Sequence, residues 1–282
     1  MKVIGTERSQ ILAGRIADAL KTEIIDVKFS KFPDGELYIR AGSLSDQMVV
    51  VGSVTDSDSF IELLLLIDAC EGRSCRLVIP YMGYARQDKK FREGEPISAR
   101  AIALALSRGV EECFTVNIHD RKVLSFFSTK ARDLSVAESI GAYIKETNIA
   151  NPLVLAPDDG ASAFAQAVAR TGGWDCDHLD KTRLSGDTVR IAPRNLDAKG
   201  RDVVIVDDII STGGTIATAA SMLTMQGARH VYAACVHGVL AGGAYARLKS
   251  AGIREIVCSD TIERGCSRYS AAVQIAHALD GC

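Results

Sequence analysis

The sequence lacks a long hydrophobic run, and it lacks an excess of either charge. The longest apolar run, from Leu63 to Ile67, is far shorter than the roughly 20 residues that cross a membrane. The whole sequence has 33 basic and 35 acidic residues, and the resulting net charge of −2 argues against nucleic acid as a main partner. Residues 1–5 have the pattern of a strand and not of a signal peptide, so we expect a cytoplasmic protein without membrane association.

The sequence also lacks closely paired cysteines. None of the eight cysteines belongs to a C-x-x-C motif, which argues against a zinc site. We expect them to be buried free thiols of a protein in a reducing compartment. They are Cys70, Cys75, Cys113, Cys176, Cys235, Cys258, Cys266 and Cys282.

No Pro/Ser-rich linker interrupts the 282 residues, a length that suits two domains. A strand, a loop, a helix and a second strand follow each other from Met48 to Pro80 and again from Val203 to Val236. This faint repeat indicates either a duplication or convergent βαβ patterning. We predict two similar α/β domains, residues 1–145 and 146–282, each a mostly parallel sheet flanked by helices. Helices are expected over residues 60–70, 97–107, 135–146, 161–170, 216–225, 243–250 and 269–279.

The most informative motif follows the apolar strand Val203–Val206. Asp207 and Asp208 stand at its end, and a short loop then leads into a helix. This loop contains Ser211, Thr212, Gly213, Gly214 and Thr215. Glycines before a helix N-terminus suit a phosphate, and adjacent carboxylates suit ribose hydroxyls or Mg²⁺. The motif predicts a ribose 5-phosphate site, although a Gly-rich turn alone can be a plain tight connection.

Two further polar segments follow predicted strands in the first half. Residues 81–92 combine aromatic, cationic and amide side chains, which suit the phosphates and base of a nucleotide or simply form a solvated basic loop. His119 and Asp120 end the strand that begins near Cys113, where a histidine can ligate a metal, bind a phosphate or be structural.

Three other segments complete the set of candidate motifs. Phe32 precedes a Pro-Asp-Gly turn and could stack on a base. Asp158 lies in an acidic Gly loop that could hold a metal-bound diphosphate. Residues 180–189 follow a strand and suggest a mobile loop that carries Lys181 and Arg183 toward a developing charge, although surface cations are common in any loop.

From about residue 32 to residue 248, the order of these motifs resembles that of ribose-phosphate pyrophosphokinases, the PRPP synthetases. The motif at 207–215 by itself is shared with type I phosphoribosyltransferases. The short chain and the Asp-Lys-Thr-Arg-Leu-Ser segment are most similar to archaeal members of the family. The resemblance implies two phosphoribosyltransferase-like domains, MgATP and ribose 5-phosphate as substrates, and self-association into at least a dimer.

The resemblance also implies a role for each motif. The implied ATP-binding residues are Phe32, Asp34, Glu36, Arg86, Gln87, Asp88 and His119, with the first three reaching the purine from a neighbouring subunit. His119 and Asp158 match positions associated with Mg²⁺, and Lys181 and Arg183 match the catalytic loop. The implied ribose 5-phosphate residues are Asp207, Asp208, Ser211, Thr212, Gly213, Gly214 and Thr215.

The sequence departs from the family pattern at three places. Ser211 stands where an Asp is usual in bacterial and eukaryotic members, and its hydroxyl can still serve a phosphate. Residues 161–163 replace a more glycine-rich and basic run in the diphosphate loop. Residues 43–47 lack the basic residue of the allosteric form, which argues against inhibition by ADP there.

The implied reaction transfers the β,γ-diphosphoryl group of MgATP to the 1-hydroxyl of ribose 5-phosphate, giving PRPP and AMP for nucleotide biosynthesis. A phosphoribosyltransferase would need neither residues 86–88 nor a second α/β domain. A non-catalytic regulatory relative would be expected to lose Lys181 and Arg183, which are present. A nucleotide-responsive transcription regulator would need a basic DNA-binding extension, and the chain shows none.

Overall fold

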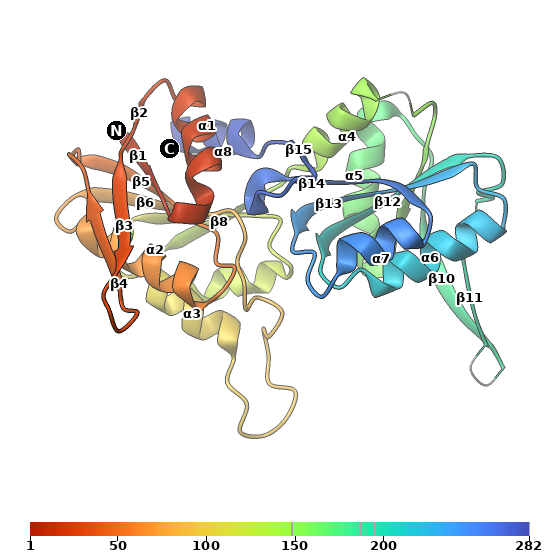
Figure 1. Ribbon diagram of the computed structural model, residues 1–282, viewed down its shortest axis with the longest axis horizontal. Coiled ribbons are helices and arrows are strands. Elements are labelled where there is room, and N and C mark those ends of the chain that lie inside the picture. The colour runs from red at the N-terminus through yellow and green to blue at the C-terminus, as the bar shows by residue number, and fades with distance from the viewer. Residues whose placement is uncertain (148, 186–187, 194–195, 282) are drawn as a thin grey trace. The chain divides into compact units, whose positions relative to one another are not determined.

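The structure is a computed structural model that describes residues 1–147, 149–185, 188–193 and 196–281, without the side chains of residues 181–193. The chain forms two compact units (Figure 1). Unit 1 consists of Met1–Ser135, Asp260–Glu263 and Ser270–Cys282, and unit 2 consists of Val136–Ser259 and Arg264–Tyr269. Unit 1 is therefore assembled from segments that are far apart in the sequence, whereas only residues 260–263 separate the two segments of unit 2.

Unit 1 is built on a parallel sheet with the strand order β2-β1-β5-β6-β7-β8. The apolar residues of its central strands are buried, as in Met48 to Val51 of β5, because helices cover both faces of the sheet. The strands are β1 (Lys2–Gly5), β2 (Glu23–Ile24), β5 (Gln47–Val51), β6 (Ser74–Ile79), β7 (Glu112–Val116) and β8 (Lys130–Leu134). A separate antiparallel hairpin consists of β3 (Val27–Lys31) and β4 (Leu37–Ala41).

The helices of unit 1 are α1 (Gln10–Ala19), α2 (Ser57–Ala69), α3 (Ser98–Leu106) and α8 (Ala272–Asp280). The carboxylate of Asp260 is buried and accepts hydrogen bonds from the Arg15 guanidinium at 2.6 Å and from the Ala271 N–H at 2.9 Å. These contacts attach the beginning of the C-terminal tail to α1, on which α8 packs (Figure 1). The tail helix, whose existence the sequence predicted without a location, therefore belongs to unit 1.

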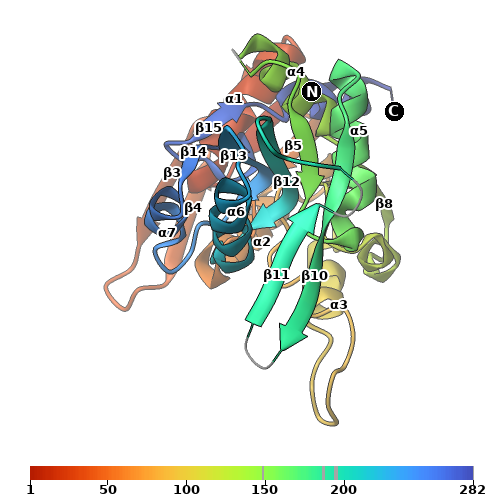
Figure 2. The same ribbon diagram turned by 90° about the vertical axis from the view of Figure 1, so that its right-hand side faces the viewer.

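Unit 2 has a larger sheet with the order β11-β10-β9-β12-β13-β14-β15, parallel except for the antiparallel pair β10–β11. Figure 2 shows this pair as two long neighbouring strands. The strands are β9 (Leu153–Ala156), β10 (Cys176–Ser185), β11 (Thr188–Pro193), β12 (Asp202–Ile210), β13 (His230–Gly238), β14 (Ile253–Ser259) and β15 (Ser267–Tyr269). The helices are α4 (Ala137–Glu146), α5 (Ser162–Gly172), α6 (Gly214–Met225) and α7 (Ala244–Ser250).

The two units repeat one topology. In unit 1, β5, α2 and β6 follow each other, and β12, α6 and β13 do so in unit 2. In each sheet the second strand lies on one side of the first, β2 beside β1 and β10 beside β9. The strands β5 to β8 and β12 to β15 are added in sequence order on the other side. The predicted pair of similar α/β domains is thus confirmed. The predicted boundary between them, after residue 145, stays a prediction.

The remaining predictions about the fold concern membrane-spanning helices and the cysteines. No helix within the described residues is long and apolar enough to cross a membrane. The cysteines from Cys70 to Cys266 are free thiols, and all of these except the half-buried Cys176 are buried. Cys282 lies outside the described residues.

Candidate functional site

The carboxylate pair of the predicted ribose site lies in β12. The strand is longer than the sequence indicated and continues to Ile210, with Asp207 paired to Cys235 of β13. The Asp208 N–H donates a 2.8 Å hydrogen bond to the Asp207 carboxylate. Both side chains are half-buried near the carboxyl end of the strand, at the edge where ligands of open α/β sheets bind.

Burial first, and then the neighbouring charge of Asp208, together raise the pKa of the Asp207 carboxyl to about 8. Asp158, which follows β9, adds a smaller repulsion to the same group. Because β9 pairs directly with β12, the two strand ends bring these acids to one edge of the sheet. Hydroxyl donors or a cation at this edge would offset the repulsion among the carboxylates.

The predicted phosphate loop follows β12 and opens α6. Gly213 adopts φ +70° and forms the N-cap of the helix without a side-chain cap. Thr212, Gly214 and Thr215 are exposed, and Ser211 is half-buried. The first turn of a helix has N–H groups without intrahelical partners and a positive end of the helix dipole, so this terminus is suited to an anion.

The segment that carries Lys181 and Arg183 differs from its prediction. Instead of a loop, residues 180–185 continue β10, which pairs with β11 from Leu179 opposite Pro193 to Ser185 opposite Thr188 (Figure 2). Cross-strand hydrogen bonding overrides the weak β-propensity of this polar segment. The side chains of Lys181 and Arg183, and residues 186–187, lie outside the described part of the chain.

In unit 1, the segment with Arg86, Gln87 and Asp88 follows β6. Its backbone is held by the Gln87 N–H, which donates to the Tyr84 carbonyl at 3.2 Å, and by the Gln87 side chain, which accepts from the Ser98 hydroxyl. Arg86 is exposed, and Gln87 and Asp88 are half-buried. The segment thus presents a cation and a carboxylate at the carboxyl edge of the unit 1 sheet.

His119 follows the neighbouring strand β7 and is exposed at the same edge. Its backbone neighbour Ile118 donates a 2.9 Å hydrogen bond to the Asp133 carboxylate in β8, which also accepts from the Thr115 hydroxyl at 2.7 Å. Asn117 between them adopts φ +41°. Sequence reasoning missed Asp133, because only the register between β7 and β8 places it beside this turn.

Phe32, Asp34 and Glu36 lie at the tip of the β3–β4 hairpin, where the predicted turn is present. Gly35 has φ +95°, and its N–H donates to the Phe32 carbonyl at 2.9 Å. The Asp34 carboxylate accepts from the Glu36 N–H at 3.2 Å. Phe32 is 49% exposed and contacts the edge of Tyr38 at a centroid distance of 5.6 Å. The hairpin is separate from the sheet that carries Arg86 and His119.

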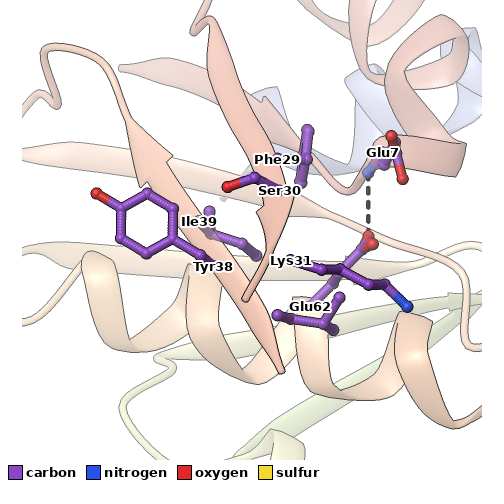
Figure 3. Close-up of a pocket in the computed structure, with 8 residues that line it drawn as sticks. Glu7, Phe29, Ser30, Lys31, Tyr38, Ile39 and Glu62 are labelled. Carbon is purple, nitrogen blue, oxygen red and sulfur yellow. Dashed lines mark hydrogen bonds between the residues drawn. The ribbon is translucent and has the colours of Figure 1, made fainter. Parts of the chain in front are cut away.

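A small cavity of about 180 Å³ lies between the hairpin and α2 (Figure 3). The buried Glu62 carboxylate accepts a 3.1 Å hydrogen bond from the Glu7 N–H, and burial raises the pKa of Glu62. Lys31 at the end of β3 pairs with Asp58 of α2 at 2.8 Å. Ligand pockets usually measure about 300–1,000 Å³, so this cavity of about 180 Å³ is too small for a nucleotide.

Comparison with known proteins identifies the family of this chain. Residues 1–108 match the model of the N-terminal domain of ribose phosphate pyrophosphokinase, and residues 125–273 match the model of the phosphoribosyl transferase domain. The chain is 51% identical over 282 residues to the ribose-phosphate pyrophosphokinase of Methanosarcina acetivorans, with 99% of each chain covered.

The chain belongs to the ribose-phosphate pyrophosphokinase family. A ribose-phosphate pyrophosphokinase from Methanosarcina mazei is 50% identical, with 100% of this chain and 96% of the relative covered. The crystal structure of phosphoribosylpyrophosphate synthetase from Mycobacterium smegmatis superposes with a TM-score of 0.85 at 28% identity, covering 99% of this chain and 97% of that one. The predicted family, enzyme class and resemblance to archaeal members are confirmed.

A second backbone segment supports the phosphate loop and was missed by sequence reasoning. After β13, the Leu240 N–H donates to the Ile210 carbonyl and the Ala241 N–H to the Ser211 carbonyl, both at 3.0 Å. The Arg247 guanidinium donates to the Thr212 carbonyl. The adjacent glycines Gly242 and Gly243 are the feature of the sequence that could have indicated this tight turn, and both have positive φ in the structure.

The residues of this pyrophosphokinase-family chain fit Mg²⁺ that arrives with a nucleotide. No cluster of three or more protein ligands is present among the described residues. Mg²⁺ usually uses only one or two carboxylates and takes further oxygen ligands from phosphates and water. The exposed Asp158 carboxylate, next to the crowded pair in β12, meets that requirement.

Proposed function

We propose that this chain is a ribose-phosphate diphosphokinase that transfers the β,γ-diphosphoryl group of MgATP to the 1-hydroxyl of ribose 5-phosphate. The products would be PRPP and AMP. One observation carries the proposal beyond family membership: a mutually repelling carboxylate pair and a helix N-terminus without a side-chain cap follow each other at one sheet edge. Sugar hydroxyls and a 5-phosphate are the two halves of one ligand that matches this arrangement.

The residues of unit 2 orient the sugar. Asp207 and Asp208 accept hydrogen bonds from its vicinal hydroxyls, and the N–H groups of residues 211–215 receive the 5-phosphate. Because the sugar is held at both ends, its 1-hydroxyl is fixed for in-line attack. The loss of conformational and rotational entropy that alignment requires then occurs on binding and not in the chemical step. Lys181 and Arg183 then stabilise charge on the transferred group and on the departing AMP.

The residues of unit 1 bind the nucleotide. Arg86, Gln87, Asp88 and His119 bind ATP from two adjacent strand ends, and the hairpin residues Phe32, Asp34 and Glu36 contact the purine from a second copy of the chain. Mg²⁺ that arrives with the nucleotide would neutralise charge on the phosphates, and His119 in unit 1 and Asp158 in unit 2 are each candidate ligands for such an ion. No side chain is assigned as general base, and deprotonation of the 1-hydroxyl is left to solvent.

Self-association into at least a homodimer and a cytoplasmic location are part of the same proposal. The exposed Phe32 ring at the hairpin tip supports the first, because an apolar ring in that position is available to another subunit. Free buried thiols support the second. Sedimentation of the full chain, compared with its Phe32→Ala variant, tests the role of the hairpin in assembly.

The deciding experiment follows the full chain, MgATP and ribose 5-phosphate by ³¹P NMR. PRPP and AMP appearing together without ADP are expected for diphosphoryl transfer, whereas ADP would indicate an ordinary kinase. Nucleotide binding without turnover, across a range of metals and phosphate concentrations, would instead indicate a regulatory subunit.

A further inference from the structure

A second cavity, of about 470 Å³, lies in unit 2 at the opposite edge of the sheet. Its walls include the first residues of β12 and β13, Asp202 and His230, together with Arg254 of β14. At about 3.3 Å per residue, Asp202 is about 17 Å along the strand from Asp207. The cavity is therefore distinct from the proposed ribose 5-phosphate site in the same unit, and its size is within the range of small-molecule pockets.

A buried carboxylate fixes an arginine and a histidine in this wall. The Asp202 side chain is 5% exposed and accepts from the Arg229 guanidinium through both oxygens, at 2.9 and 2.5 Å. It also bonds Nδ1 of His230 at 2.9 Å. These bonds hold the pKa of the Asp202 carboxyl low, with the Arg229 hydrogen bond as the main cause. With Nδ1 engaged, Nε2 of His230 is the ring atom left for a ligand.

Two more hydrogen-bond donors line the cavity. Among the described residues, the exposed Arg254 guanidinium and the Tyr232 hydroxyl make no hydrogen bond, although the two groups interact electrostatically. The remaining carboxylate, Glu255, accepts from the Tyr143 hydroxyl at 3.1 Å. Asp202 is matched by Arg229, and Glu255 remains a negative charge in the same lining. Beside these carboxylates, the cavity offers a guanidinium without a hydrogen-bond partner among the described residues, a phenol and an imidazole on one surface.

We propose that this cavity binds a small phosphomonoester with an aromatic or apolar group. The Arg254 guanidinium and the Tyr232 hydroxyl donate hydrogen bonds to the phosphate. The ring of His230, in the protonated form that donates from both nitrogens, donates a further hydrogen bond to it from Nε2. The apolar group lies against the Tyr232 ring and the side chains of Ile149 and Ala150. This binding is independent of the proposed diphosphokinase reaction.

Phenyl phosphate is a suitable probe, because it combines one phosphate with one aromatic ring. Hydrogen–deuterium exchange of the full chain should show saturable protection of residues 229–232 and 253–255, reported separately from any protection of residues 208–216. Arg254→Ala should weaken binding at this cavity about tenfold or more, the range for a lost charge-assisted hydrogen bond. Tyr232→Phe should weaken it less, because only a neutral donor is removed.

The matched control is Arg170→Ala, which removes an exposed arginine of α5 that does not line the cavity. It should bind phenyl phosphate as the unmodified chain does. Inorganic phosphate should protect the same segments at higher concentration, because it lacks the ring. No protection of these segments, or equal protection in the Arg254→Ala variant, would overturn the proposal, and so would equal affinities for the two probes.

Discussion

The Asp133 carboxylate accepts a 2.9 Å hydrogen bond from the Ile118 N–H, the backbone group immediately before His119. The same oxygen accepts from the buried Thr115 hydroxyl, so one carboxylate holds both sides of the turn that includes Asn117. Burial raises the pKa of Asp133, and the hydrogen bonds oppose that shift. Asp133 therefore positions His119 without being one of the proposed ligand-binding residues.

Replacing Asp133 by Ala should lower kcat by about tenfold or more, because a displaced binding group loses alignment. It should also lower the free energy of unfolding by about 1–3 kcal/mol, since a donor is left unsatisfied. Asp133→Asn, which keeps an acceptor oxygen, should retain most of kcat. Steady-state kinetics and denaturant unfolding of both variants measure these effects.

A double-mutant cycle with His119→Ala separates positioning from general stability. If Asp133 acts through His119, Asp133→Ala should reduce kcat little further in the His119→Ala background. The same fold-reduction in both backgrounds would show that Asp133 has no specific effect on His119.

The pKa of about 8 for Asp207 predicts a pH-dependent affinity for ribose 5-phosphate. The ionised carboxylate accepts hydrogen bonds from sugar hydroxyls more strongly than the protonated form, so KM should fall as pH rises through about 8 and level off above it. In Asp208→Asn, the loss of a neighbouring negative charge should move the midpoint to lower pH. A KM that stays flat from about pH 6 to 9 would contradict this.

The same shift has a consequence for stability with the opposite dependence on pH. A carboxyl whose folded pKa is raised above the unfolded value of 3.8 binds more protons in the folded state. Its stabilising contribution is complete below about pH 4 and is lost as pH rises through about 8. The free energy of unfolding of the unmodified chain relative to Asp207→Asn should therefore decrease over that window, as measured by urea unfolding.

Gly213 and Gly214 form a matched pair for testing the phosphate loop. Gly213 has φ +70°, and an added Cβ would approach the Leu248 side chain to 3.1 Å, so Gly213→Ala should destabilise the fold by about 1–3 kcal/mol. It should also raise KM for ribose 5-phosphate. An added Cβ at Gly214 meets no atom within 4 Å, so Gly214→Ala should leave the melting temperature nearly unchanged. Equal losses of stability in Gly213→Ala and Gly214→Ala would show that the positive φ of Gly213 does not decide the effect.

Lys181→Ala should lower kcat by at least about 10²-fold, as expected for a donor that stabilises the transition state. KM for both substrates should change much less, because the interaction is strongest at the transition state. Lys181→Arg should recover part of kcat, and Arg170→Ala serves as a control for the loss of a remote cation. An unchanged kcat in Lys181→Ala would exclude this residue from the mechanism.

Much of the fold could be predicted because its strands and helices alternate with clear apolar patterns. The predicted strand Val203–Val206 and the predicted helix 216–225 lie within the longer β12 and α6, since a buried strand and a Gly-containing turn are local features. Helix α1 was not predicted from the sequence. It contains a glycine, and its apolar residue Ile11 is exposed whereas its other apolar residues are mostly buried, so the helical periodicity of its apolar residues is weak. The 180–185 segment was wrongly taken as a loop because its pairing with β11 is not local.

The sequence by itself determined the chemistry of each strand end, because loop composition and turn glycines act over a few residues. It therefore indicated Asp207, Asp208 and the 211–215 loop as candidate binding residues, and it indicated the family. Only the tertiary structure decided which strand ends are neighbours, since strand order and register depend on packing between distant segments. For that reason Asp133 beside Ile118, the tail held by Asp260, and the cavity of Arg254 were found only in the folded chain.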